Sequence, residues 1–399
     1  MDLHSGESIW QIGKQQHADY PRLAGEIRCQ VAIVGAGITG TLISYLLNAA
    51  GQAVVLLDRG TPGEGSTAAS TGLLQHAIDT PLSELISLVG RDRAVHAYQR
   101  GLKAIDEIEA IVERVAGKCG FSRRSSMYFA SHWCDLAGLK KEIECRRAHG
   151  LPAEFLDRRQ LAAKTSIRAA GALWSEGDAQ IDPYAFTNAL LKYSAAEGLR
   201  VFQTSEVLSV EEGAGEVRLS LANGVVIADA VVMASGYEAH QQLPGWPGKL
   251  HSTYALASTP LDEYGGWPDG CLIWETARPY FYARQTEDGR AIIGGGDTAF
   301  ANDHQRDGLV ERKTAALMKR FQGLFPGIKF ELAAAWAGTF AETKDGLAYI
   351  GRVPGKSRTL AALGYGGNGI TFSMIAARLI TDLCLGNANA DEKVFCFER

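Results

Sequence analysis

Residues 31–58 contain an apolar run, a segment with apolar residues at helical spacing and a second apolar run, which predicts a strand, a helix and a second strand. The run Val31–Val34 is short, apolar and mostly β-branched, as is typical of a strand buried on both faces. From Ile38 the apolar residues recur at helical spacing until Gly51, a suitable helix end. A second apolar run then ends at Asp58. The segment therefore predicts a βαβ unit.

The turn between the first strand and the helix has the pattern G-x-G-x-x-G, here Gly35-Ala36-Gly37-Ile38-Thr39-Gly40. Gly35 allows the tight turn, Gly37 lets a pyrophosphate approach the backbone, and Gly40 lets the helix pack on the strand. Asp58 follows about 20 residues later, where a carboxylate accepts hydrogen bonds from ribose hydroxyls. We therefore expect a dinucleotide site rather than an ordinary βαβ turn, although the motif alone does not distinguish NAD from FAD.

Periodicity also predicts the elements of the remaining chain. Helices are expected where apolar residues recur every three to four positions, and strands where they alternate or form short runs. The predicted helices cover 81–116 (in two pieces), 135–148, 184–198 and 309–325. The predicted strands cover 121–130, 173–181, 201–210, 216–227, 230–236, 278–284 and 291–297, with a hairpin at Asn223-Gly224. Residues 1–28 are expected to cross the surface as a polar lead, and 336–351 to be irregular.

Two further stretches of small residues predict close contact with a ligand. Residues 59–72 form a loop of a length that is unusual between packed elements unless it binds something. Gly364–Ile370 is a glycine-rich turn that opens an apolar helix over 371–385. The N–H groups at that helix start are free to face a ligand. The chain thus has two glycine-rich helix starts, one near each end.

Composition narrows the class of protein. A length of 399 residues suggests about two domains, and 46% hydrophobic with 21% charged residues is ordinary for a globular enzyme. The net charge of −5 argues against nucleic-acid binding. The seven cysteines are scattered without a C-x-x-C, which favours reduced thiols in a cytoplasmic protein. The polar start does not look like a secretory signal, and no long apolar run predicts a membrane span.

Six motifs occur in order along the chain: the early G-x-G-x-x-G, GEGSTAASTG, VVMASG, DGRAIIGGGD, WAGTFAETKDGLAYIG and GYGGNGITFS. Together, over residues 29–386, they resemble those of the FAD-dependent oxidoreductases of the glycine oxidase and D-amino acid oxidase superfamily. The resemblance implies an α/β fold with a discontinuous Rossmann-type FAD-binding domain and a second, α+β substrate domain built on a larger mixed or antiparallel sheet. It implies FAD-binding segments at 1–117, 178–242 and 337–399, and substrate-domain segments at 118–177 and 243–336.

The resemblance also implies that the protein binds one FAD non-covalently. Relatives that tether FAD use a histidine in the small-residue loop or a cysteine near the late W-A-G, and this chain has neither in 68–70 or 336–346. Backbone N–H groups of the late turn would stabilise the negative charge of the reduced flavin. The implied cofactor-binding residues are Gly35, Gly37, Ile38, Thr39, Gly40, Asp58, Arg59, Thr67, Ser70, Thr71, Gly72, Leu73, Val207, Ala234, Ser235, Gly236, Gly338, Gly366, Gly367, Asn368, Gly369, Ile370 and Thr371.

Two arginines of the resembled family are missing from this chain. The amino-acid oxidases grip the substrate carboxylate with an arginine just after W-A-G, where this chain has Phe340. A second arginine, found in glycine oxidases, is replaced by Gly367. Phenylalanine cannot replace a bidentate guanidinium. One predicted strand carries alternating residues that would share a face: Arg278, Tyr280, Tyr282 and Arg284. Either this face recognises the substrate in place of the missing arginines, or the strand is half-buried and its arginines are solvated.

The leading hypothesis is an enzyme that oxidises a C–N bond of a small amine or amino acid by hydride transfer to flavin N5, after which the imine is hydrolysed. The candidate catalytic residues are Arg278, Tyr280, Tyr282, Arg284 and Phe340. The alternatives are a 2-hydroxy-acid dehydrogenase of the same fold, an NAD-dependent dehydrogenase, and a flavin-binding subunit of a hetero-oligomer. The electron acceptor is open, because the lysine that some sarcosine-type oxidases place beside the flavin is Ile292 here. Oligomerisation is also left open.

Overall fold

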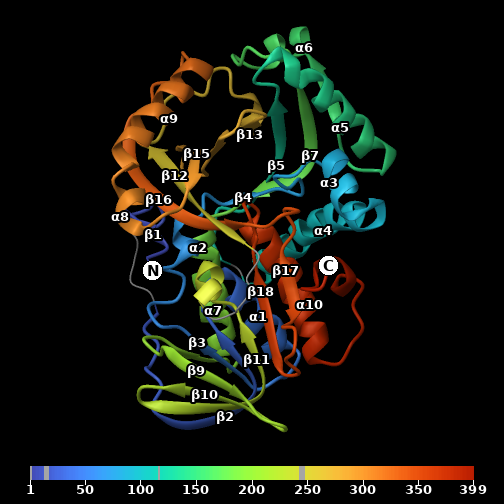
Figure 1. Cartoon of the computed structure of the whole chain (residues 1–399). Helices are drawn as coiled ribbons and strands as arrows, with labels where there is room; N and C mark the ends of the chain where they lie inside the picture. Colours follow the sequence, from blue (N-terminus) through green and yellow to red (C-terminus); the bar gives the residue numbers. More distant parts are fainter. Residues whose placement is uncertain (1, 13–17, 116, 242–247) are drawn as a thin grey trace.

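The computed structural model describes residues 2–12, 18–115, 117–241 and 248–399. Within these residues the strands form one sheet of eight strands and one of ten. Figure 1 shows the eight-stranded sheet in the lower half of the molecule and the ten-stranded sheet in the upper half. The short elements α2 (Ser66–Ala69) and β4 (Leu73–Leu74) lie where the two halves meet. The small-residue loop predicted to bind a ligand therefore runs between the two sheets.

The eight-stranded sheet is built around β2 (Gly25–Val34), which pairs in parallel with β3 (Val54–Leu57) and β11 (Gly224–Met233). Its core strands are buried on both faces, with helices on one side and a β-hairpin on the other, and this explains their continuous apolar runs. The predicted strand–helix–strand unit is confirmed. The path is β17-β18-β11-β2-β3-β8, and its other strands are β8 (Arg200–Phe202), β9 (Val207–Glu212), β10 (Val217–Leu221), β17 (Tyr349–Arg352) and β18 (Thr359–Leu363).

The ten-stranded sheet is mixed, because β5 and β13 pair in parallel while the other pairs are antiparallel. Its path is β1-β16-β12-β15-β14-β13-β5-β7-β4, with β6 beside β7. Besides β4, the strands are β1 (His4–Ser5), β5 (Ser122–Phe129), β6 (Glu154–Asp157), β7 (Gly171–Gln180), β12 (Lys249–Ser258), β13 (Leu272–Glu275), β14 (Phe281–Gln285), β15 (Ala291–Ala299) and β16 (Leu332–Glu342).

The helices begin and end where local sequence signals place them. Gly51, with φ of +78°, follows α1, and Asp182 caps α7 by accepting hydrogen bonds from the N–H groups of Tyr184 and Ala185. Besides α2, the helices are α1 (Ile38–Ala49), α3 (Leu82–Val89), α4 (Arg91–Val115), α5 (Leu136–Ala148), α6 (Arg158–Lys164), α7 (Pro183–Ala196), α8 (Asp303–Asp307), α9 (Val310–Leu324), α10 (Gly369–Cys384) and α11 (Glu392–Phe395).

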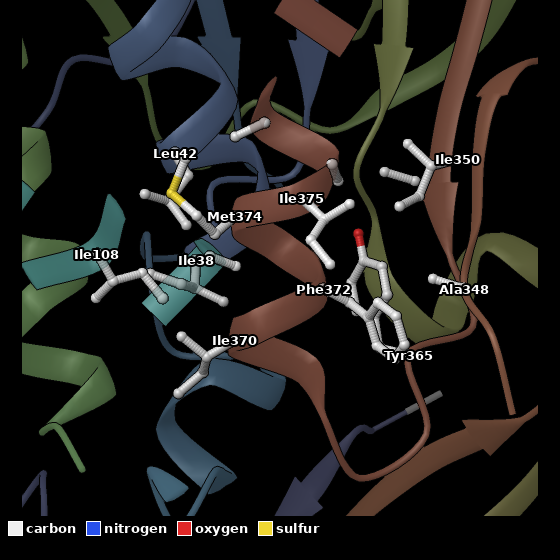
Figure 2. Close-up of a cluster of buried hydrophobic side chains, with 14 of the residues drawn as sticks. Ile38, Leu42, Ile108, Ala348, Ile350, Tyr365, Ile370, Phe372, Met374 and Ile375 are labelled. Atoms are coloured by element: carbon white, nitrogen blue, oxygen red, sulfur yellow. The ribbon is translucent and has the colours of Figure 1, made fainter. Parts of the chain in front are cut away.

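Helices α1 and α10 come from opposite ends of the chain and pack against each other. Figure 2 shows Leu42 of α1 beside Met374 of α10 in one buried cluster, with Ile38 and Ile370 nearby. The hydroxyls of Thr39 and Ser373 share a hydrogen bond of 2.7 Å between the two helices. This packing places the two glycine-rich helix starts in the wall of the same region.

Two predicted segments differ from the structure because they contact the ligand-binding loops. Residues 336–351 are not irregular: β16 crosses the ten-stranded sheet and β17 follows. Small residues of β16, such as Gly338, made this segment look irregular. They allow α2 to pack closely on the strand, because a Cβ on Gly338 would be 3.4 Å from the Cβ of Ala69. Residues 201–210 form two strands, because the segment between them folds back to donate hydrogen bonds to Gly60 and Asp58.

The N-terminal expectation was also wrong, and the strand 278–284 is shorter than predicted. Residues 4–5 join the ten-stranded sheet as β1 and residues 25–28 belong to β2, so residues 1–28 do not only cross the surface; Trp10, which is 5% exposed, anchors this part of the chain. The strand β14 begins at Phe281, so Arg278 and Tyr280 precede it. Strand β16 stays in the ten-stranded sheet beyond the predicted segment boundary at 336. The rest of the division into five segments stays a prediction.

Candidate active site

A cavity of about 480 Å³ lies between the two sheets, a size suited to a bound small molecule or cofactor. Its wall includes the turn before α1, the loop after β3, the end of β11, the start of β14 and the turn before α10. Because α1 and α10 pack side by side, both helix starts open onto this cavity. The site is thus assembled from segments that span most of the chain.

The glycines before and within α1 allow a close approach of backbone and side chains that a Cβ would prevent. A Cβ on Gly40 would stand 1.9 Å from the carbonyl oxygen of Gly35, and one on Gly37 would stand 3.1 Å from the Thr67 hydroxyl. Gly35 has φ of +104°, which favours glycine. Gly37, at the N-cap, has no side chain to satisfy the first N–H groups of the helix. This end of the cavity is therefore suited to an anion such as a pyrophosphate.

Asp58 is held in the cavity wall by the backbone of two neighbouring turns. Its carboxylate accepts hydrogen bonds from the N–H groups of Ala36 (2.7 Å) and Gly60 (2.8 Å), one at each oxygen. Burial raises the pKa of Asp58, while these two donors act in the opposite direction. Each oxygen retains a lone pair, so the carboxylate can still accept from ribose hydroxyls. Its backbone carbonyl accepts from Ser205 N–H, which brings the segment before Val207 to the same end.

The small-residue loop 59–72 is held in place by side chains from distant segments. Trp336 of β16 donates its indole N–H to the carbonyl of Ala69 (2.8 Å), and Trp10 donates to that of Ser70 (2.7 Å). Thr67 in turn accepts from the N–H of Ile38, 2.9 Å away. The loop is therefore fixed against both the start of α1 and the ten-stranded sheet.

The turn before α10 is tied to the segment 75–79 and to β16. Asn368 donates from its side-chain amide to the carbonyls of Gln75 (3.2 Å) and Ala77 (2.9 Å). Gly367 N–H donates to the Asp79 carboxylate (3.1 Å), and Gly366 N–H donates to the carbonyl of Ala341 (3.0 Å). These bonds orient the start of α10 toward the cavity.

The opposite end of the cavity from Asp58 is formed by aromatic side chains, and we call Asp79, Trp274, Tyr280, Tyr282 and Gly367 the aromatic chamber. Trp274 and Tyr282 are partners across the β13–β14 pair, so they lie side by side on one face. The ring centroids of Tyr280 and Tyr282 are 5.9 Å apart. All five residues line the cavity.

Two contacts fix the rings of this chamber. Trp274 stacks on Tyr128 with ring centroids 4.0 Å apart. Gly294 leaves room for Tyr282, because a Cβ there would be 2.2 Å from the phenol oxygen.

Burial raises the pKa of Tyr280 and of Tyr282 well above the usual value, so both are neutral phenols at physiological pH. Neither tyrosine is suited to act as a base there.

Most residues predicted to bind the cofactor line this cavity, together with Tyr280, Tyr282 and Phe340. Gly40, Gly72 and Thr371 do not line it and contribute through packing. A Cβ on Gly72 would be 2.1 Å from the carbonyl of Ile181, and the Thr371 hydroxyl donates to the carbonyl of Gln75. The lining residues are Gly35, Gly37, Ile38, Thr39, Asp58, Arg59, Thr67, Ser70, Thr71, Leu73, Val207, Ala234, Ser235, Gly236, Gly338, Gly366, Gly367, Asn368, Gly369 and Ile370.

The two candidate arginines are placed differently from the prediction. Arg284 does share a face of β14 with Tyr282, but it is 2% exposed and its guanidinium donates to the carbonyls of Gly72 (2.8 Å) and Ile181 (2.9 Å). Arg278 is exposed outside the cavity lining and donates to the backbone carbonyl of Asp79. Neither guanidinium therefore lies in the wall where a substrate carboxylate was expected.

The sequence-based prediction missed several lining residues. Asp79 follows the apolar pair Ala77-Ile78, and an isolated acid in such a stretch was the available signal. Trp274 and Thr253 reach the cavity only through strand pairing, and Leu3 and His4 through the N-terminal strand. No local pattern could have indicated these four residues.

The cavity fits the cofactor that the sequence predicted. The space left by the glycines at α1, the anchored Asp58 and the second helix start at α10 match what the ADP and flavin portions of FAD require. Residues 30–383 match the family described as FAD dependent oxidoreductase, and the protein belongs to this family. It is therefore a flavin-dependent enzyme with FAD as its cofactor, and the NAD-dependent alternative does not hold. No cysteine occurs among the described lining residues, consistent with non-covalent binding.

Known relatives cover nearly the whole chain. This chain is 28% identical over 386 residues to the glycine oxidase of Bacillus licheniformis, and the alignment covers 93% of this chain and 97% of that protein. It is 25% identical over 392 residues to the gamma-glutamylputrescine oxidoreductase of Escherichia coli (strain K12), with 96% and 89% covered. The crystal structure of glycine oxidase from Geobacillus kaustophilus shares the fold, with a TM-score of 0.80, 22% identity and coverage of 93% and 99%. The predicted fold class is confirmed.

Proposed function

We propose that the protein oxidises a C–N bond of a small amine or amino acid. The observation that carries the proposal is a single cavity that joins an FAD-binding end to a small aromatic chamber. Two relatives of this chain are named as a glycine oxidase and as a gamma-glutamylputrescine oxidoreductase, and both names describe substrates with an oxidisable C–N bond. The family and these relatives favour this reaction over oxidation of a 2-hydroxy acid.

The residues of this chain supply position, charge stabilisation and exclusion of water. FAD, when bound, supplies the two-electron acceptor for a hydride from the substrate carbon. The N–H groups at the start of α10 stabilise negative charge that develops in front of them, without a group that titrates. The rings of Trp274, Tyr280 and Tyr282 shield the reacting carbon from solvent. The substrate nitrogen loses its proton as the C=N bond forms, and water then hydrolyses the imine.

The cellular setting is also a proposal. All seven cysteines are free, two of them buried, which supports a cytoplasmic protein. Within the described residues, no helix combines the length and apolar character needed to cross a bilayer. Whether the chain forms an oligomer, alone or with another subunit, is best tested by the mass of the holoprotein in solution.

The reaction class is tested by mixing the yellow holoprotein anaerobically with a panel of amines, amino acids and 2-hydroxy acids. Bleaching of the flavin absorbance by an amine or amino acid, with release of a carbonyl product, is the expected result. Bleaching by a 2-hydroxy acid alone would contradict the proposal. So would a flavin that dithionite reduces but that no amine or amino acid bleaches. Admission of oxygen afterwards shows whether oxygen is the acceptor.

A further inference from the structure

The aromatic chamber contains a negative charge but no positive charge. Its acid is Asp79, and its two tyrosines are neutral. Among the described residues that line the whole cavity, Arg59 is the one arginine or lysine, and its guanidinium pairs with Glu238 at 2.8 Å, at the nucleotide end. A substrate carboxylate would therefore have no arginine or lysine partner among the described residues that form the chamber.

The Asp79 carboxylate remains available to a ligand. It accepts one hydrogen bond, from Gly367 N–H, and its other lone pairs stay open. Arg278 donates to the backbone carbonyl of Asp79 (3.1 Å) and to that of Ala277 (3.3 Å). In the part of the chain that the structure describes, no lysine, arginine or histidine forms an ion pair with the Asp79 carboxylate. No ion pair among the described residues therefore competes with a ligand for this carboxylate.

The rings around this acid also suit a cation. Outside the cavity lining, the guanidinium of Arg278 lies over the ring of Tyr280, 4.9 Å from its centroid, which shows that this ring accepts a cation. Trp274 is 6% exposed and lines the chamber, and its indole N–H has no partner among the described residues. Aromatic faces beside a carboxylate attract an ammonium group and repel a second carboxylate.

The positions of the missing arginines reinforce this charge reversal. Where the resembled glycine oxidases have an arginine, this chain has Gly367, and a Cβ there would meet the Asp79 carboxylate at 3.0 Å and the Tyr280 hydroxyl at 3.2 Å. At the other position, Phe340 lines the cavity and stacks on His251. An acid and aromatic rings therefore stand at the two positions where the resemblance led us to expect arginines.

We infer that the chamber selects small alkyl amines that carry only positive charge, diamines above all, over zwitterionic α-amino acids. The inference rests on the proposed C–N oxidation and specifies its substrate class. One ammonium group of the diamine pairs with Asp79 and the aromatic rings. The other amine is unprotonated. FAD, held by the segments before α1 and α10, would supply the two-electron oxidant that takes a hydride from its carbon; its nitrogen gives a proton to water, and hydrolysis of the resulting C=N bond yields an aldehyde and ammonia.

A matched set of four-carbon substrates tests the inference on the holoprotein. Diaminobutane, butylamine and γ-aminobutanoate differ mainly in the group far from the reacting carbon, and glycine, D-alanine and lactate extend the set. The expected kcat/KM is highest for diaminobutane and at least about 10-fold lower for γ-aminobutanoate and for both α-amino acids. If the α-amino acids are preferred, the inference is wrong and C–N oxidation stands. If lactate alone is oxidised, the proposed function itself fails.

The role of Asp79 is tested with D79N, which keeps the size of the side chain and an oxygen for Gly367 N–H. The expected result is a rise of about 10- to 100-fold in KM for diaminobutane, with unchanged bound FAD and unchanged reduction by dithionite. D262N, at an exposed aspartate, is the matched control and keeps the wild-type KM. An unchanged KM in D79N, or a larger loss in R278Q than in D79N, would overturn the inference.

A measurement on the wild-type protein avoids any effect of substitution on folding. Propylammonium and propionate have similar size and opposite charge, and their binding is followed as a shift of the flavin absorbance. We expect propylammonium to bind more tightly and its affinity to fall as salt is added. Tighter binding of propionate would contradict the inference, whatever the variants show.

Discussion

The two ends of the cavity are built from different parts of the polypeptide. At the nucleotide end the wall is mainly backbone, because Gly35 and Gly37 line it without side chains and Asp58 is held by the N–H groups of Ala36 and Gly60. In the aromatic chamber the wall is mainly side chains, supplied by the paired strands β13 and β14, by Tyr280 just before β14, and by the loop that carries Asp79. A change at the first end should therefore affect cofactor binding and folding. A change at the second should affect the choice of substrate.

The largest effect is expected for G40A. The added Cβ would stand 1.9 Å from the carbonyl oxygen of Gly35, and neither backbone can move without separating α1 from β2. We expect loss of bound FAD and a destabilisation of more than about 3 kcal/mol, measured as flavin absorbance per protein and by thermal or denaturant unfolding. G138A is the matched control: it lies in α5, and a Cβ there meets nothing within 4 Å. Retention of FAD and stability in G40A would contradict this account of the turn.

A smaller effect at the same end is expected for D58A. The substitution removes the acceptor of the Ala36 and Gly60 N–H groups, which is also the acceptor that we predict for the ribose hydroxyls. We expect FAD affinity for the apoprotein to fall about 10- to 100-fold, measured by quenching of flavin fluorescence. D58N retains one oxygen and should lose less. Equal loss in the two variants would show that the charge, rather than the hydrogen bonds, matters.

The same difference explains which part of the site could be predicted from the sequence. The turn at Gly35, the acid at Asp58 and the turn before α10 depend on residues near one another in the chain, so spacing alone indicated them. Asp79 and Trp274 reach the cavity through strand register and long-range packing, which no local pattern records. Arg284 shows what local patterns do not predict. The alternation placed it on the same strand face as Tyr282, but the sequence did not indicate that its guanidinium donates to the carbonyls of Gly72 and Ile181.

The fold was predictable for a similar reason. The parallel strands around β2 have continuous apolar runs because both faces are covered, and this signal is strong. Strand β16 was missed because its small residues, such as Gly338, accommodate the loop at Ala69 and so resemble an irregular segment. The N-terminal strand β1 has two residues, too few for any periodicity.

In the aromatic chamber, G367A should alter substrate kinetics without releasing FAD. The added Cβ would meet the Asp79 carboxylate at 3.0 Å and the Tyr280 hydroxyl at 3.2 Å, and both side chains can shift slightly to accept it. We expect kcat/KM for the best substrate to fall about 10-fold, with bound FAD as in the wild type. Loss of FAD comparable to that of G40A would remove the distinction between the two ends.

The smallest effect concerns Asp297, which lies behind the chamber and contrasts with Asp58. Asp58 has two backbone donors, whereas one oxygen of Asp297 is buried without a partner among the described residues. Burial raises the pKa of Asp297 from 3.8 to about 6, although a hydrogen bond from Thr253 lowers it. Of the charges that face it, Asp79 also raises the pKa, while Lys313 and Arg278 lower it.

Because the folded-state pKa of Asp297 is raised, its contribution to stability is present below 3.8 and is lost as the pH rises through about 6. D297N removes this dependence. We expect D297N to match the wild type near pH 4 and to exceed its free energy of unfolding by about 1 kcal/mol at pH 7, because partial exposure and two facing cations reduce the cost of the Asp297 charge. Denaturant unfolding at several pH values measures the difference. A difference that is constant with pH would show that the Asp297 carboxylate is better solvated than its burial suggests, and that the chamber wall admits water.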